Sequence, residues 1–116
     1  MRDITTHHVE GMRAELTLTA MGERGPGNAY SEYLVSYGPG LTQGSVLRFQ
    51  RAPQGQGLTN EILLAVVRDR LEGFQAGEYA CLENENALEA VKAAMFALAV
   101  RTVRRVARGV EGTAAV

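Results

Sequence analysis

The sequence predicts an α+β fold in which an N-terminal antiparallel β-sheet of three to four strands precedes two α-helices. Up to about residue 52, apolar residues alternate with polar ones, and segments rich in Gly and Pro separate the alternating runs. After about residue 59, apolar residues recur with the period of an α-helix. Strands followed by helices, rather than alternating with them, are typical of this fold class.

Composition limits the kinds of protein that this chain can be. The 116 residues fit one core, so we expect a single domain over 1–116, with a sheet half at 1–52 and a helical half at 58–109. A formal net charge of -1 argues against a protein that binds DNA or RNA polymers. No apolar run approaches the roughly 20 residues that span a bilayer, and the first ten residues lack the apolar core of a secretory signal. We therefore expect a cytoplasmic protein without a membrane partner.

The first half contains four segments with strand character. They cover residues 4–9, 13–21, 29–37 and 45–51. The second is the clearest, because Ala14, Leu16, Leu18 and Ala20 share one face and polar residues occupy the other. Short connections between successive strands favour an antiparallel meander.

Two segments between these strands, GERGPGN at 22–28 and GPGLTQG at 38–44, are rich in Gly and Pro. We interpret them as turns rather than as a phosphate-binding loop, because they do not lead from a strand into a helix.

The second half predicts a shorter and a longer helix. Thr59 is the expected N-cap of the first, which extends to about Phe74, and Gly77 marks the break. The second extends from about residue 80 to 108 and ends at Gly109. At ~1.5 Å per residue this helix would be about 43 Å long. Since that exceeds a small domain, we expect part of it to pack against another subunit.

The chain lacks the sequence patterns of common catalytic sites. His7 and His8 fall in an expected strand, where neighbouring side chains point to opposite faces and do not easily share a metal. Cys81 has no base beside it, and we expect a small buried residue there. There is no nucleophile elbow, zinc-helix motif or P-loop. We therefore expect neither an enzyme nor a cofactor or metal.

Four arginines near the C-terminus form the most unusual feature of the composition. They are Arg101, Arg104, Arg105 and Arg108. Residues four apart stack on one ridge of a helix, and like charges there repel unless an anion is near. The ordinary interpretation is a solvated helix end that offsets the helix dipole. The alternatives are an anionic ligand, or an acidic partner surface bound by a structural or regulatory oligomer.

Phe74 and Asn84 flank the expected joint between the two helices. Taken singly, Phe74 is best interpreted as a core aromatic and Asn84 as a capping or solvent-facing amide. Taken together, they could form a nucleotide site, since an aromatic ring stacks on a base and an amide can pair with an adenine edge.

The second half carries longer motifs than periodicity explains. They are FQxxP (Phe49, Gln50, Pro53), LTNEILLAVVxDRLxGFQAG (58–77), ACxENxxAL (80–88) and RTxxRxxRGVEGT (101–113). In order and spacing, these motifs resemble the Thoeris anti-defence 1 family of phage proteins over about residues 47–113. The N-terminal strands resemble the family more loosely.

The resemblance implies a function and an assembly. Members of the family are non-enzymatic sponges in the host bacterial cytoplasm. They bind and hide the cyclic ADP-ribose isomer that a bacterial TIR immune protein makes, and some also hold cyclic di- or trinucleotides made by CBASS enzymes. The family fold is an antiparallel sheet followed by two helices, assembled as dimers and often as hexamers.

The resemblance also implies roles for particular residues. Phe74 would stack on adenine, Asn84 would hydrogen-bond the ligand, and Arg48 would meet the pyrophosphate. Arg101 and Arg105, with Thr102 between them, match a C-terminal pair linked to phosphate contacts and to a cyclic trinucleotide pocket between subunits. The chain departs from the family pattern at Leu82, at Glu85-Asn86 and at Ala114, where Arg, a more apolar pair and His are common.

Overall fold

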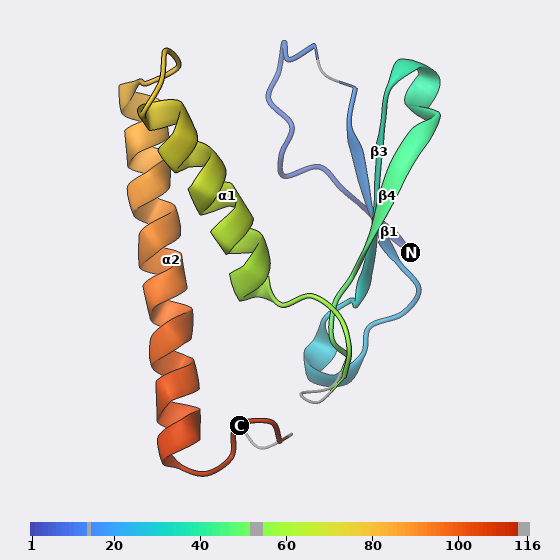
Figure 1. Cartoon of the computed structure of the whole chain (residues 1–116). Coiled ribbons are helices and arrows are strands. Elements are labelled where there is room, and N and C mark those ends of the chain that lie inside the picture. Colours follow the sequence, from blue (N-terminus) through green and yellow to red (C-terminus); the bar gives the residue numbers. More distant parts are fainter. Residues whose placement is uncertain (14, 52–54, 114–116) are drawn as a thin grey trace. The chain divides into compact units, whose positions relative to one another are not determined.

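The computed structural model describes residues 1–13, 15–51 and 55–113 (Figure 1). Ala14, Pro53 and Ala114, which entered the sequence analysis, lie outside the described residues. The chain divides into two compact units, Met1–Leu58 and Thr59–Val116. The first unit contains the sheet and the second contains both long helices. The single domain over 1–116 stays a prediction.

The first unit is a four-stranded antiparallel sheet with the strand order β1-β2-β3-β4. The strands are β1 (Arg2–Ile4), β2 (Thr17–Met21), β3 (Glu32–Tyr37) and β4 (Gln43–Arg48), and two 3-10 turns are η1 (Pro26–Asn28) and η2 (Pro39–Leu41). In the register, Ala20 of β2 lies opposite Arg2 on one side and Tyr33 on the other. Ala20 is fully buried. The predicted fold class, an antiparallel sheet followed by two helices of which the last is long, is confirmed.

The first strand differs from its predicted position. A strand over 4–9 is wrong beyond Ile4, because residues after it turn, with the His8 N–H donating to the Thr5 carbonyl at 2.9 Å. His7 therefore does not lie in a strand, and its Nε2 lies 3.3 Å from the Leu16 carbonyl oxygen. No group of three or more His, Cys, Asp or Glu that could hold a metal occurs among the described residues.

A tight connection follows β4 and holds its end in place. Phe49 and Leu58 form an isolated parallel bridge, in which the Leu58 N–H donates to the Arg48 carbonyl at 2.8 Å and the Gln50 N–H donates to the Leu58 carbonyl at 3.0 Å. Gly57 has a φ of 136°, and a Cβ there would lie 2.7 Å from the Phe49 carbonyl carbon. Only glycine fits this approach without strain.

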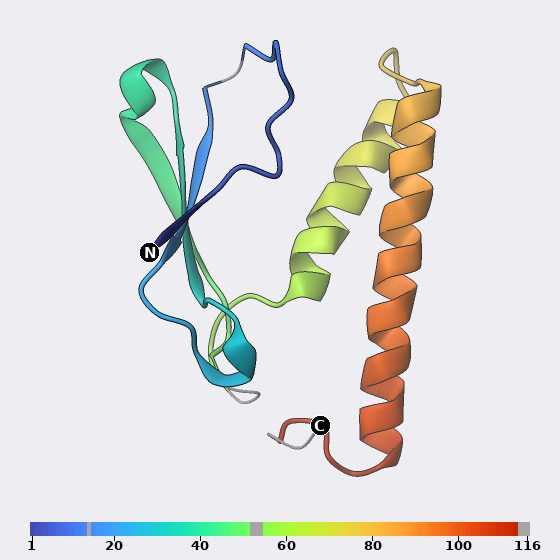
Figure 2. The same cartoon turned by 180° about the vertical axis from the view of Figure 1, so that it is seen from behind.

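The second unit is a pair of adjacent helices, α1 (Asn60–Gln75) and α2 (Leu82–Ala107), seen from both sides in Figures 1 and 2. The predicted cap of α1 is confirmed, because the Thr59 side chain accepts a hydrogen bond from the Ile62 N–H at 3.3 Å. Leu88 of α2 is the best-buried apolar side chain of this unit among the described residues, at 5% exposed. None of the described helices is both long enough and apolar enough to cross a membrane.

The two ends of α2 are defined by local contacts. Cys81 is exposed rather than buried as predicted, because it serves as the N-cap, and its Sγ accepts from the Asn84 N–H at 3.4 Å. At the other end, Gly109 adopts a φ of 72° and stops the helix, as its position predicts.

Candidate functional site

The turn between α1 and α2 brings Phe74 and Asn84 together through Tyr79. Phe74 is half-buried on the last turn of α1, and Asn84 is half-buried on the first turn of α2. The Tyr79 ring meets the Phe74 ring edge-on, with centroids 6.0 Å apart and an interplanar angle of 77°. The Asn84 Nδ2 donates to the Tyr79 carbonyl at 3.1 Å. Two residues that the sequence analysis singled out therefore share one local structure.

Gln75 closes this turn with its own side-chain amide. Its Oε1 accepts from the Cys81 N–H at 3.0 Å, and its Nε2 donates to the Cys81 carbonyl and to a Glu85 carboxylate oxygen, each at 3.2 Å. An amide that pairs both with the N–H and with the carbonyl of one residue holds the backbone in one arrangement. Gln75 thus ties the end of α1, which carries Phe74, to the start of α2, which carries Asn84.

Arg70 lies against the Phe74 ring. Its guanidinium carbon is 5.4 Å from the ring centroid, a cation–π distance. A base that stacks on Phe74 must therefore use the opposite face or displace Arg70. Neither Arg70 nor Tyr79 was predicted from the sequence to belong to this site. The spacing of four between Arg70 and Phe74 on one helix was the signal for the first, whereas Tyr79 lies outside any periodic pattern.

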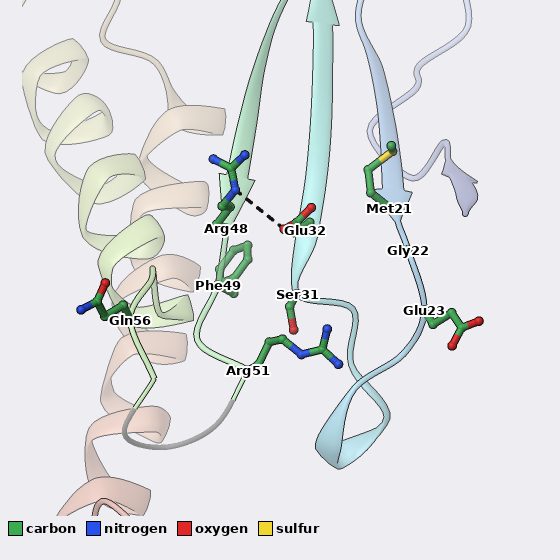
Figure 3. Close-up of a pocket in the computed structure, with 9 residues that line it drawn as sticks. All are labelled: Met21, Gly22, Glu23, Ser31, Glu32, Arg48, Phe49, Arg51 and Gln56. Atoms are coloured by element: carbon green, nitrogen blue, oxygen red, sulfur yellow. Dashed lines mark ion pairs between the residues drawn. The ribbon is translucent and has the colours of Figure 1, made fainter.

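Arg48 lies in the other unit, in a hollow at one end of the sheet (Figure 3). The hollow has a volume of about 330 Å³. Its lining residues lie at or next to the end of β2, the start of β3 and the end of β4. They are Met21, Gly22, Glu23, Ser31, Glu32, Arg48, Phe49, Arg51 and Gln56. The Arg48 Nε forms an ion pair with Glu32 at 3.7 Å, and both side chains are more than half exposed. Such a pair contributes only ~0–1 kcal/mol, so a phosphate could replace Glu32 as the partner of Arg48.

Arg51 supplies a second guanidinium to the same hollow, which the sequence analysis did not assign. A Cβ placed on Gly25 would lie 3.4 Å from its Nη2, so the guanidinium lies close to the loop that follows β2 (Figure 3). Within the described residues Arg51 makes no ion pair. The hollow therefore holds two arginines and two glutamates, and its cations are the groups suited to a phosphate.

The three C-terminal site residues, Arg101, Thr102 and Arg105, differ in their exposure to solvent. Arg101 and Thr102 are exposed on α2. Arg105 is only 5% exposed, and its Nε donates to a Glu111 carboxylate oxygen at 3.1 Å. Its Nη2 donates to the carbonyls of Val110 and Thr113 at 3.0 Å and 2.9 Å.

Arg105 is therefore part of the C-terminal turn, and its guanidinium is already satisfied within the chain. No acidic residue lies between Arg101 and Arg108 in the sequence, but Glu111, after the helix, forms an ion pair with Arg105. Arg101 makes no hydrogen bond or ion pair with the described residues, and it is the exposed member of the pair.

The length of α2 separates the two groups of site residues. Asn84 and Arg101 are both on α2 and are 17 positions apart, which at ~1.5 Å per residue is about 26 Å along the axis. One small ligand does not span that distance within one chain. Phe74 and Asn84 thus form one zone, and Arg101 and Thr102 belong to another.

The chain is similar to a known phage protein. No family model matches the chain. Over 73 residues, the chain is 40% identical to a protein of Bacillus phage SBSphiJ7 named "Thoeris anti-defense 1". The match covers 60% of this chain and 51% of the phage protein, so it spans about half the length of that relative. The resemblance to this kind of protein that the motifs predict is confirmed.

Proposed function

We propose that this chain is a phage anti-defence protein of the Thoeris anti-defence 1 kind. In this proposal it binds and sequesters the cyclic ADP-ribose isomer made by a Thoeris TIR protein in the host bacterial cytoplasm, without cleaving it. The observation that carries the proposal is the 40% identity to the phage protein of that name. The grouping of Phe74 and Asn84 in one closed turn supports it, because an aromatic face and an amide are what an adenine requires.

The described residues suit binding at several parts of such a ligand. Phe74 supplies a ring for stacking on the base, and Asn84 supplies an amide for the base edge. Within the sheet unit, Arg48, which the resemblance assigns to the pyrophosphate, and Arg51 have guanidinium groups of the kind that pairs with phosphate oxygens through two parallel hydrogen bonds. We assign all four side chains to binding and none to a chemical step.

Cyclic di- and trinucleotides would bind in a second place. Since Arg101 and Thr102 lie about 26 Å along α2 from Asn84, we assign these ligands to the C-terminal zone. An exposed Arg101 from each of several subunits could meet around one ligand in a dimer or hexamer. Arg105 stabilises the chain next to this zone, because its guanidinium donates hydrogen bonds to Glu111 and to the Val110 carbonyl in the turn after α2.

The function is tested by incubating the protein with the cyclic ADP-ribose isomer, removing unbound ligand and denaturing the protein by heat. A sponge depletes the ligand from solution and then releases it intact, which mass spectrometry detects. Release of a cleaved product would contradict the proposal and indicate an enzyme.

A second candidate is a structural or regulatory oligomer that binds an acidic partner through its C-terminal arginines. Arg101 and Arg104, both exposed, are the observation that favours it. Such a protein would leave all of the ligand in solution in the same experiment, so the two functions give opposite results.

A further inference from the structure

The connection between β2 and β3 carries an aromatic ring with two arginines against it. The guanidinium carbon of Arg24 lies 4.9 Å from the centroid of the Tyr30 ring, and that of Arg2 lies 5.7 Å from it. Both are cation–π distances. Arg24 belongs to the connection itself and Arg2 to β1, so the two guanidinium groups come from separate segments of the sheet unit and meet at one ring.

Hydrogen bonds close the loop that presents Arg24. The Gly25 N–H donates to the Ala29 carbonyl at 2.8 Å, and the Asn28 N–H donates to the Gly25 carbonyl at 3.0 Å. The Arg24 Nη1 donates to the Asn28 carbonyl at 3.0 Å. The Arg24 guanidinium is thus positioned by a ring and by one carbonyl, and its other N–H groups make no hydrogen bond to the described residues.

No carboxylate among the described residues neutralises this pair. Arg2 and Arg24 are exposed, and neither forms an ion pair with the described residues. Glu23 is the one acidic residue between β2 and β3, and it forms no such ion pair either. A third guanidinium, that of Arg51, lies beside the same loop at Gly25 (Figure 3). Like charges held close together repel one another, and an anion bound to them removes this repulsion.

We propose that Arg2 and Arg24, positioned by Tyr30, form a binding site for a small anion with two linked phosphate groups. Each guanidinium fork can pair with the oxygens of a different phosphate. The half-buried Tyr30 ring already has both arginines against it, so it positions them rather than stacking on a base. The site goes beyond the proposed function, because neither arginine is among the residues assigned there to the cyclic ADP-ribose isomer.

Calorimetry with inorganic pyrophosphate tests the site directly. We expect the wild type to bind pyrophosphate and Arg24→Gln to bind it at least tenfold more weakly. The matched control is Arg13→Gln, which removes the same charge from another exposed arginine of the sheet unit and should keep the wild-type affinity. A wild type that does not bind, or an equal loss in both variants, would overturn the proposal.

Two changes at Tyr30 test whether the ring positions the arginines. Tyr30→Phe keeps the ring and should keep the affinity for pyrophosphate, whereas Tyr30→Leu removes the ring and should weaken binding about as much as Arg24→Gln does. Circular dichroism would check that both variants keep the sheet. A well-folded Tyr30→Leu protein with the wild-type affinity would contradict the role of the ring.

The same Arg24→Gln protein separates this site from the proposed function. It should still deplete the cyclic ADP-ribose isomer from solution as the wild type does. Loss of both ligands would mean that they share one site, which would overturn a separate site for pyrophosphate. Binding of pyrophosphate by a wild type that leaves the isomer in solution would contradict the proposed function alone.

A nucleoside diphosphate carries the same two linked phosphates, so ADP is the second ligand to compare. Phe74→Ala would be used for this comparison, because it removes the proposed adenine site. Pyrophosphate should bind this variant at least as tightly as ADP does, since the site recognises phosphate alone. Tighter binding of ADP would reveal a contact with the nucleoside and would overturn recognition through phosphate alone.

Discussion

At the scale of single residues, Phe74 offers the most direct test of the proposed adenine site. Phe74→Ala removes a stacking face that contributes ~1–3 kcal/mol to binding of a base. Calorimetry with the cyclic ADP-ribose isomer should therefore show a Kd raised by roughly 5- to 150-fold. Ile62→Ala is the control, because Ile62 is also an apolar residue of α1 but lies 51% exposed near the opposite end of that helix. An unchanged Kd for Phe74→Ala would place the base elsewhere.

Arg101 and Arg105 look equivalent in the sequence but should behave differently on substitution. Arg105→Ala removes a nearly buried group together with its hydrogen bonds to Glu111 and to the carbonyls of Val110 and Thr113. We expect the free energy of unfolding to fall by about 2 kcal/mol. Arg101→Ala removes an exposed side chain and should change it by less than ~0.5 kcal/mol.

Urea denaturation would measure both variants. Arg101→Ala should still weaken binding of a cyclic trinucleotide, if the wild type binds one. Equal stability of the two variants would show that the contacts of Arg105 contribute nothing to folding.

At the scale of elements, the connection after β4 depends on one glycine. Gly57→Ala places a Cβ 2.7 Å from the Phe49 carbonyl carbon at a φ that side chains disfavour. The strain should lower the free energy of unfolding by about 1–3 kcal/mol. It should also loosen the bridge between Phe49 and Leu58, which holds Arg48 at the end of β4. Chemical denaturation would measure the loss.

Gly73→Ala is the opposite case and serves as the comparison. Gly73 is helical, and a Cβ there would meet nothing within 4 Å. This change should raise the free energy of unfolding by roughly 0.5–1 kcal/mol. If Gly57→Ala unfolds with the same free energy as the wild type, the backbone around residue 57 accommodates a Cβ, and the close approach to Phe49 does not require glycine.

At the scale of the whole molecule, the surface of α2 predicts association with other copies. Ala20 and Leu88 are the only buried apolar side chains among the described residues, whereas Phe96, Val103 and Val106 are 72%, 66% and 60% exposed. These three, with Ala99 between them, recur at intervals of three and four, so they lie along one face of α2. An apolar face of this kind is typical of a protein–protein interface.

We therefore expect at least a dimer in light scattering at micromolar concentration. Val103→Glu should shift the mass toward that of the 12.5 kDa monomer, because it buries a carboxylate in the expected interface. Asn86→Glu adds the same charge at an exposed polar position of α2 and should leave the mass unchanged. A monomeric wild type would contradict the assembly and, with it, a ligand pocket shared between subunits.

Features that depend on neighbours within four residues could be predicted from the sequence. The cap at Thr59 and the stop at Gly109 follow from local hydrogen bonding and backbone preference, and the helical period follows from which residues share a face. The first strand shows the limit of such reasoning. Its position at Arg2–Ile4 was decided by its register against β2 and by the Met1 amine, which donates to the Gly22 carbonyl at 3.0 Å.

The chain alone determined the order of sheet and helices, the residue types of the candidate site and its likeness to a phage anti-defence protein. Only the tertiary structure decided what those residues contact. Tyr79 joins Phe74 to Asn84 because the chain reverses between α1 and α2, and Arg105 turns inward because the segment after α2 folds back to bring Glu111 to its guanidinium. Periodicity describes the faces of one element. A hydrogen bond to a turn carbonyl depends instead on the path of the chain between elements, which no periodic pattern specifies.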